Sequence, residues 1–240
     1  MLKTVLPVLI CICFFSASHA QVNSAVAFYK AGMEHKKNNR FSEALGAFSQ
    51  ATSLNKRFDS AFYEMGNIYS GSGNADMAII NYRKTLVINP RFANALINTG
   101  KVYRDIKLNL DSAMYFYQAA VTIDTTNKEL FYSLAWTHNA RKEYEQAIPY
   151  AIKALELDNK YKPAYGELGH AYRATKKYAE AIEQFKKNLA ISVMDVALLY
   201  SGYCYTELNN KEGALQMYEE LKKVNEKMSG ALKKKIDTMQ

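Results

Sequence analysis

Small and large apolar residues recur along this chain at helical spacings, and the whole pattern repeats about every 34 residues. In a typical unit Gly66 is followed 12 residues later by Ala78, and a large apolar residue stands four places before that glycine. Aromatic residues follow at Tyr69 and Tyr82. Spacings of three and four place side chains on one face of a helix. Each unit therefore predicts two amphipathic helices of about 12–15 residues, packed as an antiparallel hairpin.

Six units can be aligned in this register. The third unit has one extra residue near 107–109, in the turn between its helices, and the fourth has Ala135 in place of the glycine. The remaining segment, 229–240, predicts a short helix with Ala231, Leu232 and Ile236 on its inner face, which caps the array. The predicted units are 25–58, 59–92, 93–127, 128–161, 162–194 and 195–228.

The pattern resembles the tetratricopeptide repeat, whose signature is W-x2-L-G-x2-Y…A-x3-F…P. The unit 59–92 matches nearly every position, including the closing Pro90, and the resemblance covers almost all of the chain after residue 24. It implies an all-α fold, a right-handed α-solenoid of about six tandem hairpins plus a C-terminal capping helix. One hairpin cannot bury its apolar face alone, so stacking must stabilise the units. We therefore expect a single solenoid domain over residues 21–240.

The first 20 residues do not belong to the repeat. Lys3 supplies a positive charge, residues 5–15 form an apolar run, and residues 18–20 offer the small side chains that a signal peptidase reads. The run of 11 residues is too short to cross a bilayer, which needs about 20. We predict that residues 1–20 are a secretory signal peptide cleaved before Gln21. The chain is then exported, to a bacterial periplasm or, as the alternative, fully secreted.

Cleavage would leave Cys204 as the one cysteine of the exported chain, which excludes an internal disulfide. The residues in the same register of other units are Ile68, Val102 and Ala171. Because these are apolar, we expect Cys204 to be a buried small group and not a reactive thiol.

The formal charge of the chain is +8, and it is concentrated at the C-terminal end. Residues 221–240 contain six lysines and two acidic residues. The outer face of a terminal repeat must be polar, and lysines provide such a face. The alternative is that this basic end contacts an anionic membrane surface. Export makes nucleic acid a poor candidate partner, and we predict none.

No catalytic constellation accompanies the repeats. His35, His138 and His170 lack the spacing of a metal site. The segment 71–74 is rich in glycine, but it lacks the lysine and hydroxyl of a phosphate-binding loop and is better explained as a turn. We therefore predict that the chain is not an enzyme and needs neither metal nor cofactor.

In the family that the chain resembles, the first helix of each hairpin lines a concave groove. Carried over residue by residue, this implies a groove of aromatic, amide and cationic side chains. Amides can pair with a peptide backbone, and cations can hold a carboxylate. Trp136, the only tryptophan, is the predicted binding hot spot. The predicted groove residues are Tyr29, Tyr63, Asn67, Asn94, Asn98, Lys101, Arg104, Tyr132, Trp136, Asn139, His170, Arg173 and Tyr203.

Some members of the family bind the acidic tails of cytosolic chaperones through a clamp of five residues. Asn67 and Asn98 fit that clamp, whereas Tyr63, Glu129 and Ser133 do not, so we exclude this role. The repeats determine neither the partner nor the oligomeric state. We predict an exported, non-catalytic scaffold that binds a peptide or partner protein in its groove. The alternative is a peripheral envelope factor that uses the basic C-terminal end on an anionic surface.

Overall fold

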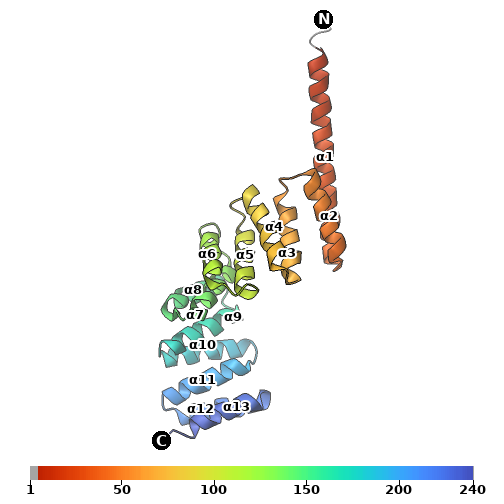
Figure 1. Cartoon of the computed structure of the whole chain (residues 1–240). Coiled ribbons are helices and arrows are strands. Elements are labelled where there is room, and N and C mark those ends of the chain that lie inside the picture. Colours follow the sequence, from red (N-terminus) through yellow and green to blue (C-terminus); the bar gives the residue numbers. More distant parts are fainter. Residues whose placement is uncertain (1–4, 240) are drawn as a thin grey trace. The chain divides into compact units, whose positions relative to one another are not determined.

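The computed structural model describes the backbone of residues 5–239 and the side chains of residues 21–239 (Figure 1). The described residues form only helices, so the all-α prediction is confirmed. The predicted signal peptide, 1–20, lies outside the described side chains, and its cleavage stays a prediction. The helices are α1 (Val5–Lys37), α2 (Phe41–Leu54), α3 (Asp59–Gly71), α4 (Ala75–Ile88), α5 (Ala93–Asp105), α6 (Leu110–Val121), α7 (Lys128–Ala140), α8 (Tyr144–Leu157), α9 (Lys162–Ala174), α10 (Tyr178–Ile191), α11 (Asp195–Glu207), α12 (Lys211–Val224) and α13 (Glu226–Ile236).

Each predicted unit holds one pair of helices joined by a short turn, and each turn contains one residue in the left-handed backbone region. In most units this residue follows the glycine position by seven places, as Gly73 follows Gly66. In the third unit Leu108 follows Gly100 by eight places. The extra residue predicted near 107–109 is therefore confirmed. The left-handed residues are Asn39, Gly73, Leu108, Lys142, Lys176 and Asn209.

The chain divides into two compact units, residues 1–109 and 110–240. The division falls in the third repeat, between α5 and α6. Within the first unit each helix from α1 to α5 packs against the next. The prediction of a single solenoid domain over residues 21–240 stays a prediction.

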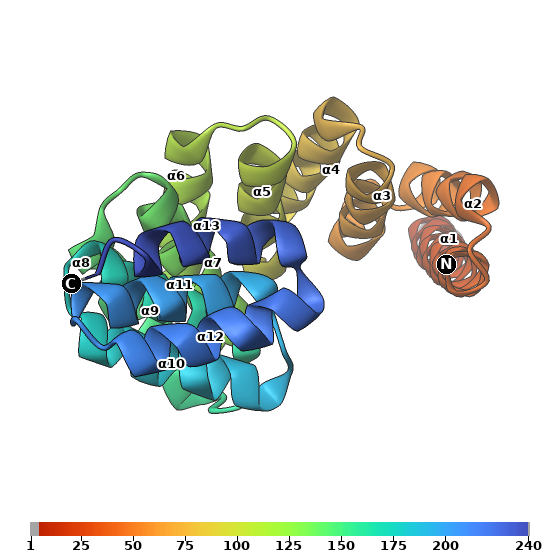
Figure 2. The ribbon, with the colours of Figure 1, turned by 90° about the horizontal axis from the view of Figure 1, so that it is seen from below.

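Within the second unit the helices stack in chain order from α7 to α13 (Figures 1 and 2). Each helix packs against the next, and α7 also contacts α9, α9 contacts α11, and α11 contacts α13. The first helices of successive repeats therefore form one layer. The second helices, α8, α10 and α12, form the other.

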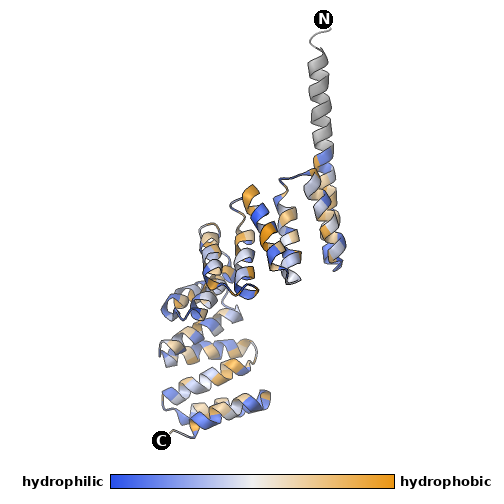
Figure 3. Ribbon diagram, viewed as in Figure 1, coloured by the Kyte–Doolittle hydropathy of each residue, from blue (hydrophilic) through white to orange (hydrophobic). Residues whose placement is uncertain are grey.

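Hydrophilic and hydrophobic residues alternate along the helices, as expected for elements with one buried face (Figure 3). Among the described residues, no helix combines the length and the apolar character that a membrane span requires.

Glycines admit aromatic rings of the same hairpin in close contact. A Cβ atom on Gly66 would lie 2.5 Å from the ring of Tyr82, and one on Gly32 would lie 2.6 Å from Phe48. Both rings are buried. These aromatic rings thus fill space inside their own hairpin. They also reach the next hairpin, because Tyr82 packs in one cluster with Val102 of α5.

The capping helix α13 lies slightly earlier in the chain than the predicted segment 229–240. Leu232 and Ile236 are buried as predicted, but the inner position predicted for Ala231 is wrong, because this residue is exposed. Leu232 lies against Gly202 so closely that a Cβ atom on this glycine would collide with it. The leucine therefore occupies the space that an aromatic ring fills in other repeats.

Cys204 is fully buried on α11, which confirms its predicted structural role. It packs with Ala181, Phe185 and Ala197 in an apolar cluster. Burial raises the pKa of its thiol to about 12. The thiolate, the reactive form, is therefore scarce in the folded protein.

The contact at Gly66 gives a stability prediction. Gly66→Ala should lower the free energy of unfolding by about 1–3 kcal/mol, because the buried Tyr82 ring must shift to admit the methyl group. Gly46→Ala on α2 is the matched control, since nothing lies within 4 Å of its added Cβ. That control should gain about 0.5–1 kcal/mol from helix propensity. Urea denaturation followed by circular dichroism measures both values. Equal effects of the two substitutions would contradict this account of the packing.

The burial of Cys204 gives a reactivity prediction. At about pH 8 a maleimide reagent should leave Cys204 unmodified in the native protein and modify it fully in urea, because only unfolding exposes the thiol and restores its usual pKa. Peptide mapping by mass spectrometry locates the label at this residue. Rapid modification of the native protein would show that α11 is not packed as described.

Candidate functional site

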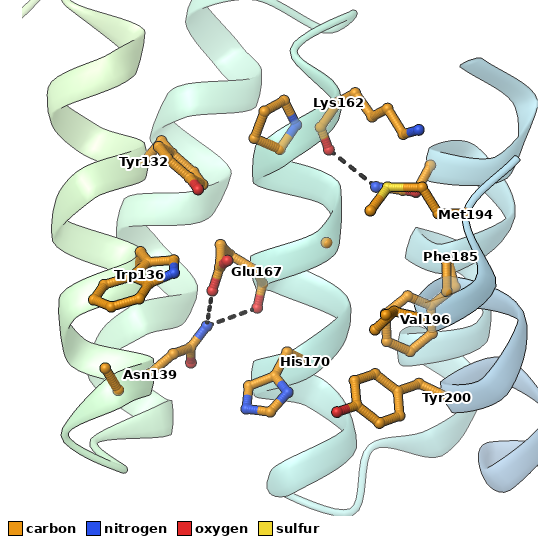
Figure 4. Close-up of a pocket in the computed structure, with 15 residues that line it drawn as sticks. Tyr132, Trp136, Asn139, Lys162, Glu167, His170, Phe185, Met194, Val196 and Tyr200 are labelled. Carbon is orange, nitrogen blue, oxygen red and sulfur yellow. Dashed lines mark hydrogen bonds between the residues drawn. The ribbon is translucent and has the colours of Figure 1, made fainter. Parts of the chain in front are cut away.

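A cavity of about 480 Å³ opens in the second unit among the first helices of three successive repeats. Figure 4 shows Tyr132 and Trp136 of α7 on one side and Val196 and Tyr200 of α11 on the other. Residues of α9 lie between these two walls. The floor includes Phe185 from α10.

Helical spacing explains why these side chains converge. Tyr132, Trp136 and Asn139 occupy positions i, i+4 and i+7 of α7, which share one face. On α9, Glu167 and His170 are related in the same way by a spacing of three. The first helices form one layer, so their equivalent faces point into the same cavity.

Five aromatic rings lie among the 15 residues that line the cavity. The rings of His170 and Tyr200 are 6.0 Å apart between centroids, and Tyr132 packs edge-to-face against Tyr161 at 5.7 Å. Trp136 is half-buried. Aromatic walls of this kind give large contact area with few rotors to immobilise.

Two buried asparagines bring unpaired acceptors to the cavity. Asn139 is 6% exposed, and its Nδ2 donates to the backbone oxygen of Glu167 at 3.0 Å and to Oε2 of the same residue at 2.8 Å. Asn188 is 3% exposed, and its Nδ2 donates to the backbone oxygen of Lys162 at 3.1 Å. The Oδ1 atoms of both asparagines are buried and accept no hydrogen bond from the described residues.

The charged groups near the cavity are held by neighbours. The ammonium of Lys162 donates to the backbone oxygen of Ser192 at 2.9 Å. Burial lowers the pKa of His170, and the nearby Arg173 guanidinium lowers it further. His170 therefore carries no charge at neutral pH. The cavity is also lined by the Glu167 carboxylate, whose Oε2 accepts from Asn139, so its surface combines aromatic, apolar and charged groups.

Arg173 and Tyr203, both predicted groove residues, lie beside the cavity and do not line it. The guanidinium carbon of Arg173 is 4.4 Å from the centroid of the Tyr200 ring, a cation–π contact. The Tyr203 ring lies 6.4 Å from that of Tyr200. These residues therefore support a wall of the cavity.

In the first unit, predicted groove residues form a hydrogen-bonded network. Nδ2 of Asn98 donates to the Tyr63 hydroxyl at 3.1 Å and to Oδ1 of Asn67 at 2.9 Å. The Tyr82 hydroxyl also donates to this Oδ1, at 2.9 Å. Burial raises the pKa values of Tyr63 and Tyr82. The amides that we expected to pair with a peptide backbone thus already bond to neighbouring side chains.

The other predicted residues of the first unit have different surroundings. The Tyr29 ring packs against Phe58 at 4.9 Å, and Arg104 forms two hydrogen bonds to the adjacent Asp105, at 2.6 and 2.8 Å. Lys101 is half-buried and Asn94 is exposed on α5.

The cavity gathers four of the predicted groove residues: Tyr132, Trp136, Asn139 and His170. The groove rule missed Asn188 because it considers only the first helix of each repeat. The sequence does mark Asn188 as unusual, since three other repeats have alanine at the equivalent position: Ala51, Ala120 and Ala154. An asparagine in place of a buried alanine marks a polar group in need of a partner.

Met194 and Val196 also line the cavity, and both were missed. Met194 precedes α11 and Val196 lies in its first turn. The repeat pattern does not predict which way side chains point at these positions. Among the described residues, no cluster of three or more histidine, cysteine or acidic side chains could hold a metal ion.

Family models and solved structures identify the relatives of this chain. Models described as "Tetratricopeptide repeat" match residues 59–92, 129–161, 163–192 and 196–225, which together exceed half of the chain. The crystal structure of MamA protein has a TM-score of 0.65 and 26% identity, over 72% of this chain and 94% of MamA.

Two further structures share the fold at lower identity. YrrB, described as a TPR protein with an unusual peptide-binding site, has a TM-score of 0.72 and 24% identity, over 78% of this chain and 98% of YrrB. Pseudomonas aeruginosa pilF has a TM-score of 0.74 and 16% identity, over 87% of this chain and 95% of pilF.

Among curated proteins, the small glutamine-rich tetratricopeptide repeat-containing protein 2 of Saccharomyces cerevisiae is 37% identical over 75 residues. The match spans 31% of this chain and only 22% of the yeast protein. Proteins built from this repeat mediate protein–protein interaction and are not enzymes. By its repeats and by its fold, this chain belongs to the tetratricopeptide repeat family.

Proposed function

We propose that this chain is an exported, non-catalytic scaffold that binds a peptide segment of a partner protein in the cavity among α7, α9 and α11. The observation that carries the proposal is the pair of buried, unpaired amide oxygens of Asn139 and Asn188, two residues that line a cavity with several aromatic rings. A buried acceptor without a partner costs about 1–3 kcal/mol. Both oxygens are closed to solvent in this structure, so an occupant must turn the two side chains toward the cavity to donate hydrogen bonds to them and recover this free energy.

A peptide matches this chemistry. Its backbone N–H groups are donors, and its side chains supply apolar surface for the Trp136 and Tyr200 rings. Burial lowers the pKa of His170, and Lys162 and Glu167 are each hydrogen-bonded to neighbouring groups. The peptide-binding site described for YrrB, which shares the fold, supports a peptide as the class of ligand.

Export is the second part of the proposal, and it is based on residues 1–20. Their charge, apolar run and small residues before Gln21 match a secretory signal peptide. The mature chain would hold the single, buried Cys204, which needs no disulfide partner in an oxidising compartment. We place the protein in a bacterial periplasm.

The alternative is that the basic C-terminal end contacts an anionic membrane surface. Two of its lysines already have carboxylate partners, because Lys235 pairs with Glu207 at 2.5 Å and Lys233 pairs with Asp237. Lysines that form ion pairs within the chain are consistent with the role of α13 as a polar cap. Binding in the cavity is therefore the better-supported function.

Trp136 tests the site directly. Trp136→Ala should weaken capture of the partner from an envelope extract by at least about tenfold, because a central aromatic anchor contributes about 2 kcal/mol or more. Tyr115→Ala is the control, since this ring is 68% exposed on α6 and does not line the cavity. Quantitative mass spectrometry of the captured proteins compares the three chains. Capture of the same proteins in the same amounts by Trp136→Ala would refute the cavity as the binding site.

Export is tested at the N-terminus. The protein recovered from the periplasmic fraction should begin at Gln21, as shown by N-terminal sequencing and intact mass. Ala20→Leu should block processing, because signal peptidase requires a small residue at this place. Recovery of the unprocessed wild-type chain in the cytoplasm would contradict export and leave the cavity proposal intact.

A further inference from the structure

The outer face of α4 differs from a solvated helix face. Ala78, Tyr82 and Thr85 point into the core, whereas Ile80 and Val87 point outward and are 45% and 83% exposed. The visible side of α4 carries strongly hydrophobic bands beside hydrophilic ones (Figure 3). Single exposed apolar residues are ordinary, but two on one helix face need comparison with the other repeats.

At each of these two positions one other repeat has an acidic residue that pairs with a lysine, and the remaining repeats have other residue types. On α10, Glu183 pairs with Lys187 at 3.9 Å, and in the register of α4 these positions are Ile80 and Lys84. On α8, Lys153 pairs with Glu156 at 3.0 Å.

In the register of α4 this second pair corresponds to Lys84 and Val87. Lys84 therefore has Ile80 and Val87 at the two positions where the equivalent lysine of α10 or α8 has its carboxylate partner. No described residue forms an ion pair with Lys84.

A hollow of about 390 Å³ lies beside this face in the first unit. It is lined by the apolar side chains of Phe62, Ile80 and Val87 and by the cations of Lys56 and Arg83 together with Lys84. The Lys84 ammonium is 5.2 Å from the centroid of the Phe62 ring. The hollow has no acidic lining residue, and its three cations form no ion pair with any residue in the described part of the chain.

We propose that this hollow is a second docking site, which takes an acidic segment of a partner protein with one bulky apolar side chain. The carboxylates would pair with the three cations, as Glu156 pairs with Lys153 on α8 and Glu183 with Lys187 on α10, and the apolar side chain would fill the hollow between Phe62 and Val87. The hollow can receive a side chain, and the vesicle experiment below distinguishes a peptide from a bilayer surface. The site does not involve the cavity lined by Trp136 and does not depend on the function proposed for it.

The test uses blocked six-residue peptides with defined chemistry. The acidic probe has a central Leu-Phe pair flanked on each side by two glutamates. One control replaces the glutamates by lysines, and the other replaces the Leu-Phe pair by two serines. Methyl NMR of the full chain should show shifts at Ile80, Val87 and Ile88 with the acidic probe alone, and rising salt should weaken them.

Charge reversal supplies the matched variants. Arg83→Glu with Lys84→Glu should weaken binding of the acidic probe by about tenfold or more. Lys186→Glu with Lys187→Glu changes the same register positions on α10 and should leave binding within about twofold. Ile80→Glu with Val87→Glu places on α4 the acidic residues that α10 and α8 carry singly at these positions, and this variant should also lose the probe. All six residues lie outside the cavity of the second unit.

Three results would overturn the proposal. The first is the absence of shifts at Ile80 and Val87 with the acidic probe at millimolar concentration. The second is equal binding of the lysine control, which would show apolar contact without charge selection. The third is binding to vesicles of phosphatidylglycerol, lost in the α4 variants, without binding of the acidic probe, which would assign the surface to a membrane. None of these results bears on capture through Trp136.

Discussion

The close contact between a glycine on one helix and a ring on the next determines most of this structure. Where Gly66 meets Tyr82, the missing Cβ lets two helices approach until an aromatic ring fills the space between their backbones. The same ring then reaches Val102 of the following repeat. One side chain thus links the hairpin to the array, which is how short helices of marginal intrinsic stability become a continuous core.

Much of the fold could be predicted from the sequence, because these packing positions recur with a fixed period. The helix pairs, the longer turn at Leu108 and the burial of Cys204 all follow from register. The exposure of Ala231 could not be predicted in this way, because the capping helix has no equivalent helix in another unit from which its rotation could be inferred. The period therefore predicts most reliably where a residue has equivalents in other units.

The candidate site was harder to predict, since specificity lies in departures from the period. A rule for groove positions found Trp136 and Asn139, but it could not show that Asn67 and Asn98 already bond to each other. Whether an asparagine bonds to a ligand or to a neighbouring side chain depends on its rotamer and on the distance to that neighbour. A family sequence pattern contains neither. Asn188 is the opposite case, because it stands where three other repeats have alanine, and it lines the cavity.

The contact between Leu232 and Gly202 has a consequence for how such an array can evolve. In other repeats the notch above the glycine holds a ring of the same hairpin, but here a helix that follows the last hairpin fills it. A hairpin duplicated directly after α12 would have to compete with α13 for this notch. A hairpin inserted between two internal repeats has no such competition, because each of its two faces packs against a repeat of the same kind. Gain of repeats is therefore easier in the interior of the array than at its capped end.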